Sequence, residues 1–167
     1  KNPQTRGSGA SVQESRWPKP DLGWCKLNTD GSFSAFGEAG AGMILRDHKG
    51  AVIFAATCVF FNCGDPLEAE MAAMDEGLRL ALHWSNLSLV VETDCAALYA
   101  NQVNEIRRIL AHERNISLAK ISRHANLHEA SHTLACMGRS QQRTACWLRN
   151  FPDEIASIVK SECNHLA

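Results

Sequence analysis

The sequence predicts an α/β fold in which helices flank a mixed five-stranded sheet. Two observations predict it: three segments with strand patterning follow one another early in the chain, and helical and strand patterns alternate after them. Strands joined by short turns pair antiparallel, whereas strands separated by a helix pair parallel. We therefore expect a sheet whose first three strands are antiparallel, followed by alternating helix and strand.

The three early strands are expected between residues 24 and 61. WCKLNT alternates apolar and polar residues and ends at Asp30-Gly31. AGMILRDHKGAVIFAATCVFF contains two further strand patterns, separated by turn-forming residues at 47–50. Together these segments predict a three-stranded meander.

The alternating part begins after Asp65-Pro66. Apolar residues recur at helical spacing through Trp84, and LSLVVET at 87–93 is typical of a short buried strand. A helix over 95–110, a strand over 116–122 and a helix over 127–137 complete the expected order β-β-β-α-β-α-β-α. Helices of this kind are expected to pack on the sheet.

The chain divides into three expected regions. Residues 1–16 are rich in Ser, Gly, Gln and Asn, and are expected to form a disordered lead. Residues 17–140 are expected to form the folded domain, and 141–167 a helical C-terminal extension. WLRNFPDEIASIV, at 147–159, is an amphipathic helix candidate whose simplest placement is against its own domain.

Composition limits the classes of protein. The 167 residues are 45% hydrophobic, which suits one globular domain with a real core. The polar start and the lack of a long apolar run favour an intracellular monomer, cytoplasmic or nuclear, without a signal peptide, a membrane segment or a membrane partner. Seven irregularly spaced cysteines favour a reducing compartment.

Charge is unevenly distributed along the chain, although the net charge is only −1. Between residues 106 and 149, eight basic residues accompany two acidic ones. This excess suits a surface that faces phosphates, and it suits a solvated basic face equally well.

Three carboxylates lie at or near the ends of expected elements. Asp30 closes the first strand, Glu70 lies near the start of the long helix, and Asp94 follows the fourth strand. Phosphodiester hydrolysis with two Mg²⁺ ions about 3.5–4 Å apart needs such hard oxygen ligands. Each residue also has a simpler explanation, because Asp before Gly forms turns, Glu is favoured near a helix N-terminus, and Asp caps helices.

Four segments, in this order, resemble one family: GWCKLNTDGSF, GAGMILRDHKG, EAEMAAMDEGLRLAL and VVETDCAAL. They are similar to the type 1 ribonuclease H-like domain of plant proteins, a reverse-transcriptase-like family with many retroelement-related members. The resemblance runs from about residue 17 to residue 163 and covers the C-terminal extension. It implies a ribonuclease H-like fold and agrees with the strand order expected from the patterns alone.

The resemblance also implies the site residues. Asp30, Glu70 and Asp94 would be metal ligands for two Mg²⁺ ions, with Mn²⁺ as a possible substitute. The segment SHTLA places His132 at the fourth catalytic position, where an imidazole suits softer metals better than Mg²⁺. Upstream of Glu129 two alignments stay open: two residues are inserted after Asn126, or His128 takes the position of the family's Asn.

Contacts with nucleic acid are implied for a further set of residues: Asn28, Gly31, Ser32, Gly42 and Arg46. Because Gly31 and Gly42 have no side chain, the backbone there could approach the minor groove of a hybrid closely. In that groove 2′-hydroxyls distinguish RNA from DNA. For Gly42 a tight turn or a β-bulge explains the residue equally well, and Arg46 would face either solvent or a phosphate. His124 and His128 are expected to be exposed to solvent.

The implied function is endonucleolytic hydrolysis of the RNA strand of RNA-DNA hybrids by a two-metal-ion mechanism. The alternative is a catalytically weak or inactive nucleic-acid-binding module derived from a retroelement. Two departures from the family favour the alternative: His132 replaces a carboxylate, and only 37 residues separate Asp94 from His132. In that short interval Arg107, Arg108 and Arg114 are the candidates for phosphate contacts.

Overall fold

The computed structural model describes residues 17–98, 115–121 and 128–163. The expected lead at 1–16 lies outside these residues, as do most of the expected helix over 95–110, the three arginines proposed to contact phosphates, and His124. No helix among the described residues combines the length and the apolar character needed to cross a membrane.

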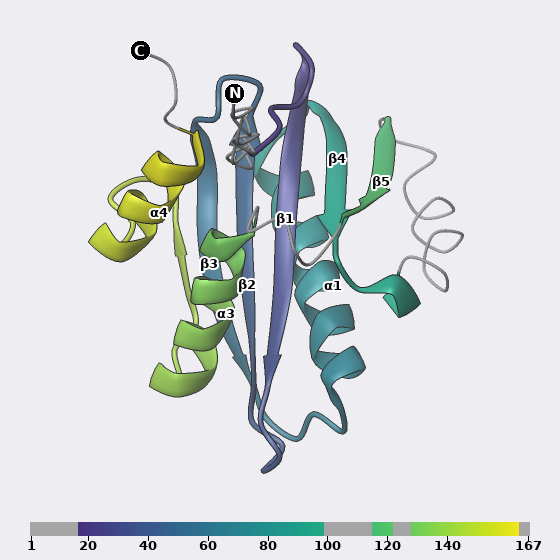
Figure 1. Ribbon diagram of the computed structural model, residues 1–167, viewed down its shortest axis with the longest axis vertical. Helices are drawn as coiled ribbons and strands as arrows, with labels where there is room; N and C mark the ends of the chain where they lie inside the picture. The colour runs from purple at the N-terminus through teal and green to yellow at the C-terminus, as the bar shows by residue number, and fades with distance from the viewer. Residues whose placement is uncertain (1–16, 99–114, 122–127, 164–167) are drawn as a thin grey trace, which may run out of the picture.

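A single mixed sheet forms the centre of the molecule (Figure 1). Its strands are β1 Trp24–Phe33, β2 Ala39–Asp47, β3 Val52–Phe60, β4 Ser88–Thr93, β5 Ile116–Lys120 and β6 Ala145–Trp147. They lie in the order β5-β4-β1-β2-β3-β6. β1, β2 and β3 are antiparallel neighbours, while β4 runs parallel to β1 and β5 runs parallel to β4. The expected mixed sheet is confirmed.

The sheet has one strand more than expected. β6 lies in the C-terminal extension, which was expected to be helical, and it pairs antiparallel with the edge of β3. Three residues are too few for an alternating pattern to be recognised in the sequence. The edge of β3 supplies the partner that makes this short segment a strand.

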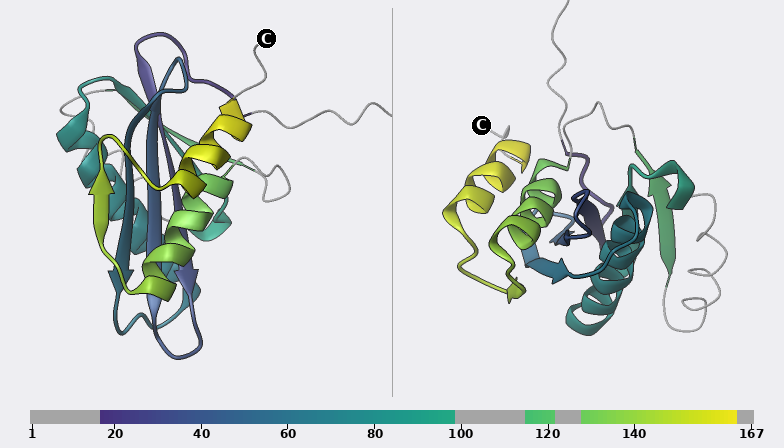
Figure 2. Two further views of the ribbon diagram at one scale, coloured as in Figure 1. Left: turned by 90° about the vertical axis from the view of Figure 1, so that its left-hand side faces the viewer. Right: turned by 90° about the horizontal axis from the view of Figure 1, so that it is seen from below.

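In the part of the chain that the structure describes, three helices with defined bounds cover the two faces of the sheet (Figure 2). They are α1 Pro66–Trp84, α3 Glu129–Gln141 and α4 Asp153–Cys163. α1 packs over one face, in a core cluster with residues of β1, β2, β3 and β4. α3 and α4 share a second core cluster on the opposite face. Of the amphipathic helix predicted at 147–159, only 153–159 lies in α4 and packs against its own domain, because Trp147 ends β6 and the helix begins after Pro152.

The start of α1 follows from its sequence. The Asp65 carboxylate accepts a hydrogen bond from the Glu68 N–H at 2.8 Å and so caps the helix. Pro66 stands at the first helical position, where its missing N–H costs nothing. This start fixes where Glu70 lies relative to the sheet.

Glycines in β1 and β2 let helix backbones touch the sheet. A Cβ added to Gly31 would lie 2.6 Å from the Glu70 backbone N, on the α1 side. A Cβ on Gly42 would lie 1.9 Å from the Ser131 carbonyl oxygen, on the α3 side. Gly42 was expected to meet nucleic acid or to form a turn or bulge; the structure instead places it in β2, directly beneath α3.

We expect Gly42→Ala to lower the free energy of unfolding by about 3 kcal/mol, because α3 would have to move away from β2 to admit the methyl group. Urea denaturation measures the change. Gly64→Ala is the matched control, since its Cβ would meet only the mobile Glu68 carboxylate, at 3.1 Å. An equal loss of unfolding free energy in the two variants would show that the contact between the Gly42 and Ser131 backbones does not determine how closely α3 packs on β2.

Candidate active site

The three predicted carboxylates come together at one end of the parallel strand pair. β1 and β4 are neighbours, and their register pairs Asn28 with Glu92. Asp30 lies two residues after Asn28, and Asp94 lies two residues after Glu92. Helix α1 brings Glu70 to the same place. One carboxylate oxygen from each of the three residues lies within 4.8 Å of the others. The sequence prediction that these side chains meet agrees with this geometry.

The position of Glu70 depends on the close contact between α1 and β1. Its Oε2 accepts a hydrogen bond from the Gly31 N–H at 3.1 Å. A side chain at Gly31 would push the helix backbone away and break this contact. The glycine after Asp30 therefore brings the second carboxylate to the first.

His132 reaches the same cluster from α3. Its Nδ1 lies 2.8 Å from Asp30 Oδ2, and because a carboxylate only accepts, Nδ1 carries the proton of this hydrogen bond. Nε2 lies 3.6 Å from the Sγ of Cys136, one helical turn further on, whose thiol can donate to it. The imidazole is 65% exposed, compared with 15% for the Asp30 side chain. The structure thus places His132 as a hydrogen-bond donor to Asp30.

The donor set fits a divalent cation. Three carboxylates supply hard, anionic oxygen ligands, which Mg²⁺ and Mn²⁺ prefer. The side chains come from three separate elements, each held by the fold, so the cluster does not depend on one flexible loop. Asp30, Glu70 and Asp94 are the residues that would hold such an ion.

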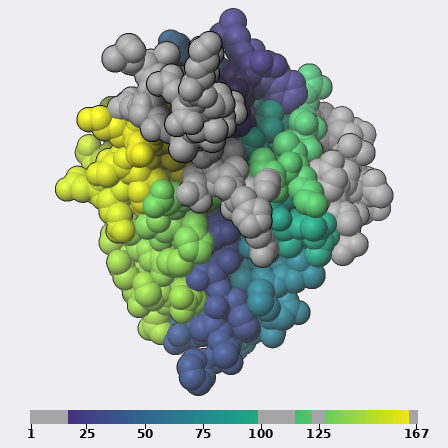
Figure 3. Space-filling view, in the orientation of Figure 1, coloured from purple at the N-terminus to yellow at the C-terminus, as the bar shows by residue number. Residues whose placement is uncertain are grey.

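Ser32 and Arg139 lie beside the cluster. Ser32 is on the same face of β1 as Asp30, and its Oγ accepts from Arg139 Nε at 2.8 Å. Arg139 follows His132 by seven residues, so both lie on one face of α3. In the sequence, Arg139 is one of the eight basic residues between 106 and 149, and its helical spacing from His132 is the signal that could have identified it. Figure 3 shows β1 reaching the surface between α3 and α1.

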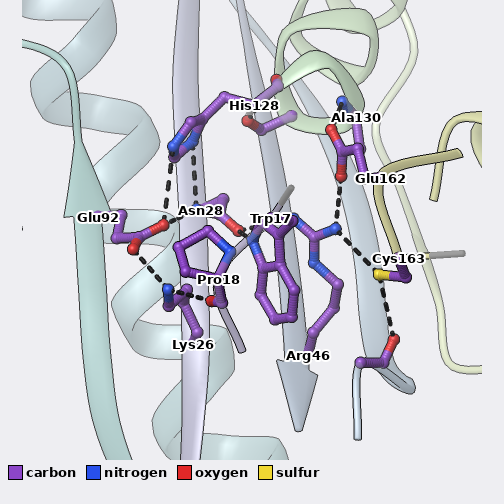
Figure 4. A network of polar contacts seen from close by, with 12 residues as sticks. Trp17, Pro18, Lys26, Asn28, Arg46, Glu92, His128, Ala130, Glu162 and Cys163 are labelled. Atoms are coloured by element: carbon purple, nitrogen blue, oxygen red, sulfur yellow. Dashed lines mark hydrogen bonds and ion pairs between the residues drawn. The ribbon is translucent and has the colours of Figure 1, made fainter. Parts of the chain in front are cut away.

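Asn28 and Arg46 are buried, contrary to their expected contacts. Both have no exposed surface. Arg46 was expected to face solvent or a phosphate, but its Nη1 pairs with the Glu162 carboxylate of α4 at 2.5 Å and its Nη2 donates to Asn28 Oδ1 (Figure 4). Its guanidinium also stacks 3.9 Å from the Trp17 ring. Arg46 therefore pairs with a carboxylate of the C-terminal helix α4, where solvent or a phosphate was expected.

His128 is partly buried, although it was expected to be exposed. Its side chain retains 17% exposure, and Nδ1 lies 3.2 Å from Asn28 Nδ2. Burial lowers the pKa of His128 to about 3, and the positive charges of Arg46 and Lys26 act in the same direction. His128 is the N-cap residue of α3 and is neutral at physiological pH.

Comparison with known proteins places this site in a family. The model of the reverse transcriptase-like family matches residues 28–151. None of the curated proteins matches the chain. The match includes all four residues of the candidate site and most of the described sheet.

Solved structures share the fold at low sequence identity. RNase H1 from Halobacterium salinarum NRC-1 is 15% identical, with a TM-score of 0.62 over 71% of this chain and 98% of that chain. LC11-RNase H1, solved in complex with an RNA/DNA hybrid, is 20% identical, with a TM-score of 0.57 and the same coverage. The protease-reverse transcriptase of Prototype Foamy Virus is 19% identical, with a TM-score of 0.54 over 77% of this chain and 22% of that one. By its family match and its topology, the chain belongs to the reverse transcriptase-like family and has a ribonuclease H-like fold.

Proposed function

We propose that the protein is a metal-dependent endoribonuclease that hydrolyses the RNA strand of RNA-DNA hybrids. The observation that carries this proposal is the convergence of Asp30, Glu70 and Asp94 within 4.8 Å on a ribonuclease H-like fold. The hybrid bound to LC11-RNase H1 supports the same class of substrate. The chemistry, the substrate and the metal are parts of one proposal, and each has its own test.

The carboxylates would hold two Mg²⁺ ions, or Mn²⁺ in their place. Bound there, such ions supply activation of the attacking water and stabilisation of the leaving oxygen. Asp30 is central in this arrangement, because it lies on β1 between Asp94, the residue that follows β4, and His132 on α3. The fold thereby brings the ligands together before substrate binds.

His132 contributes to the proposed site through Asp30. By donating Nδ1–H to Oδ2, it would fix the plane of the Asp30 carboxylate. An imidazole adds no negative charge, so the three carboxylates alone would balance the charge of bound cations. His132 is therefore proposed as a catalytic-site residue that positions a ligand.

Substrate contacts are proposed for the surface next to Asp30. Gly31 and Ser32 continue β1 from the carboxylate cluster, and Arg139 joins them from α3. The Arg139 guanidinium has further N–H donors beside the one used by Ser32, and these suit a phosphate of the hybrid. Ser32 is only 8% exposed, so its proposed role is to hold Arg139 beside the cluster through its Oγ. Asn28, Gly42 and Arg46 are not included, because the fold encloses all three.

The alternative function is a catalytically weak or inactive nucleic-acid-binding module. The observation that favours it is the Asp30–His132 hydrogen bond, because it occupies one oxygen of a proposed metal ligand. Such a module would bind a hybrid and leave it intact in both Mg²⁺ and Mn²⁺.

We expect the protein to cut the RNA strand of a labelled hybrid in Mg²⁺ or Mn²⁺, and Asp30→Asn to lower the rate at least about 100-fold. The reason is that loss of a direct ligand should cost no less than loss of a group that only supports one. Asp75→Asn is the control: it removes an exposed carboxylate from α1, outside the cluster. Equal cutting by the wild type and Asp30→Asn would sink the assignment, while hybrid binding without cutting would favour the alternative.

We also expect Mg²⁺ to stabilise the folded protein, by about 2.7 kcal/mol at 100 times its dissociation constant, because the ion binds only the assembled cluster. Denaturant unfolding with Mg²⁺ and with EDTA measures this difference. Asp94→Asn should lose most of the stabilisation, and Asp75→Asn should keep it. If Mg²⁺ stabilised Asp94→Asn as much as the wild type, the ion would be binding elsewhere.

A further inference from the structure

A second set of three side chains lies directly behind the candidate site. Asn28 precedes Asp30 by two residues on β1, and Glu92, its partner in the parallel pairing of β1 with β4, precedes Asp94 by two residues. On α3, His128 precedes His132 by four residues. A step of two along a strand, or of four along a helix, returns to the same face. The two sets are therefore successive layers on the same three elements.

Asn28 joins the three elements in the inner layer (Figure 4). Its Nδ2 donates to Glu92 Oε2 at 2.9 Å and to His128 Nδ1, the contact described above. Its Oδ1 accepts from Trp17 Nε1 at 3.0 Å and from Arg46 Nη2 at 2.8 Å. Both donors and both lone pairs of the amide are thus occupied, which leaves the side chain one orientation.

That orientation determines the protonation of His128. Since Asn28 Nδ2 donates, Nδ1 of His128 must accept, and the proton of the neutral ring lies on Nε2. Nε2 faces Glu92 Oε2 at 3.7 Å, too far for a hydrogen bond. Protonation at Nδ1 would break the contact with Asn28.

The start of α3 has no cap from its own residues. His128 makes no side-chain cap hydrogen bond, and the Ala130 N–H instead donates to Glu162 Oε1 of α4 at 3.2 Å. Consequently, among the described residues, the contacts of Asn28 with His128 and of Glu162 with Ala130 help to hold the start of the helix that carries His132 from outside α3.

We propose that Asn28, Glu92 and His128 form a positioning layer that sets the relative places of Asp30, Asp94 and His132. His128 is the positioning residue on α3: its contact with Asn28 fixes the first turn and so brings His132 Nδ1 to Asp30 Oδ2. The effect of this layer on catalysis rests on the proposed function. Its effect on the placement of His132 against Asp30 does not.

The direct test is the tautomer of His132, read from its imidazole ¹⁵N shifts in the full-length, histidine-labelled protein with EDTA at a pH where the ring is neutral. In the wild type the hydrogen bond to Asp30 requires the proton on Nδ1. His128→Ala should reduce the Nδ1–H fraction at least twofold. His128→Asn should retain it, because an amide oxygen can occupy the place of Nδ1 and accept from Asn28.

Met137→Ala is the matched control for lost helix stability. Met137 is buried at the other end of α3, away from the positioning layer. This variant should leave the His132 tautomer unchanged. If His128→Ala does not fold, Asn28→Asp replaces it: this change keeps the acceptor for Trp17 and Arg46 and removes both donors, so the same shift is expected.

Catalysis gives a second readout. His128→Ala should lower kcat about tenfold with KM within twofold, and His128→Asn should restore kcat. A wild type without any cleavage would contradict the proposed function, whereas the tautomer comparison would still decide on the positioning layer. An unchanged tautomer in both His128→Ala and Asn28→Asp, or an equal change in Met137→Ala, would overturn the positioning layer.

The stability of the protein against acid checks the neutral state of His128. The groups that face its ring are Lys26 on β1, Arg46 on β2 and Glu92 on β4. The unfolded ring takes up a proton near pH 6.5, but the folded ring, with its pKa lowered to about 3, does not. Between these values stability is lost as pH falls, so unfolding of the wild type at pH 5 should take up about one proton more than unfolding of His128→Asn. Equal proton uptake would mean that His128 is charged in the fold.

Discussion

The close approach of the two helix backbones to the sheet is the constraint on which the candidate site depends. Gly31 lets α1 come near enough for Glu70 to accept from the β1 backbone, beside Asp30. Gly42 does the same for α3 on the other face, so that the short imidazole of His132 reaches Asp30. With ordinary side chains at these glycines, both helices would stand further off, and neither residue would reach the carboxylate.

Beneath the site, the fold buries charges where apolar residues would serve stability as well. Lys26 pairs with Glu92 at 2.6 Å and Arg46 with Glu162, and none of these side chains is more than 5% exposed. Desolvation offsets much of the attraction in such pairs, so their net contribution to stability is small. They do penalise misplacement: a strand shifted by one residue would turn Lys26 to the apolar face and leave Glu92 unpaired. A site whose ligands come from several elements depends on correct strand register, and this energetic penalty favours the correct register.

Sequence patterns predicted the parts of the site that depend on local order. Asp94 directly follows the end of β4 as expected, whereas Asp30, expected to close its strand, lies inside β1, which continues to Phe33 because it stays paired with β2; the resemblance supplied His132. The misplaced residues depend on distant partners instead. Arg46 meets Glu162, 116 residues away, and His128 meets Asn28, 100 residues away. No periodicity or composition near a residue reports a contact of that kind, and β6 was missed for the same reason.

The replacement of a carboxylate by His132 changes the electrostatics of the cluster more than its shape. A fourth carboxylate beside Asp30 would add charge to a site that already holds three within 4.8 Å, and two divalent cations would be needed to offset it. An imidazole that donates to Asp30 relieves that repulsion, because the hydrogen bond stabilises the charged form of the carboxylate. In the proposed two-ion site, the same change would weaken the attraction for a second cation. Stability without metal and affinity for a second ion would thus vary in opposite directions at this position, and the proposed positioning layer would determine how closely His132 holds Asp30.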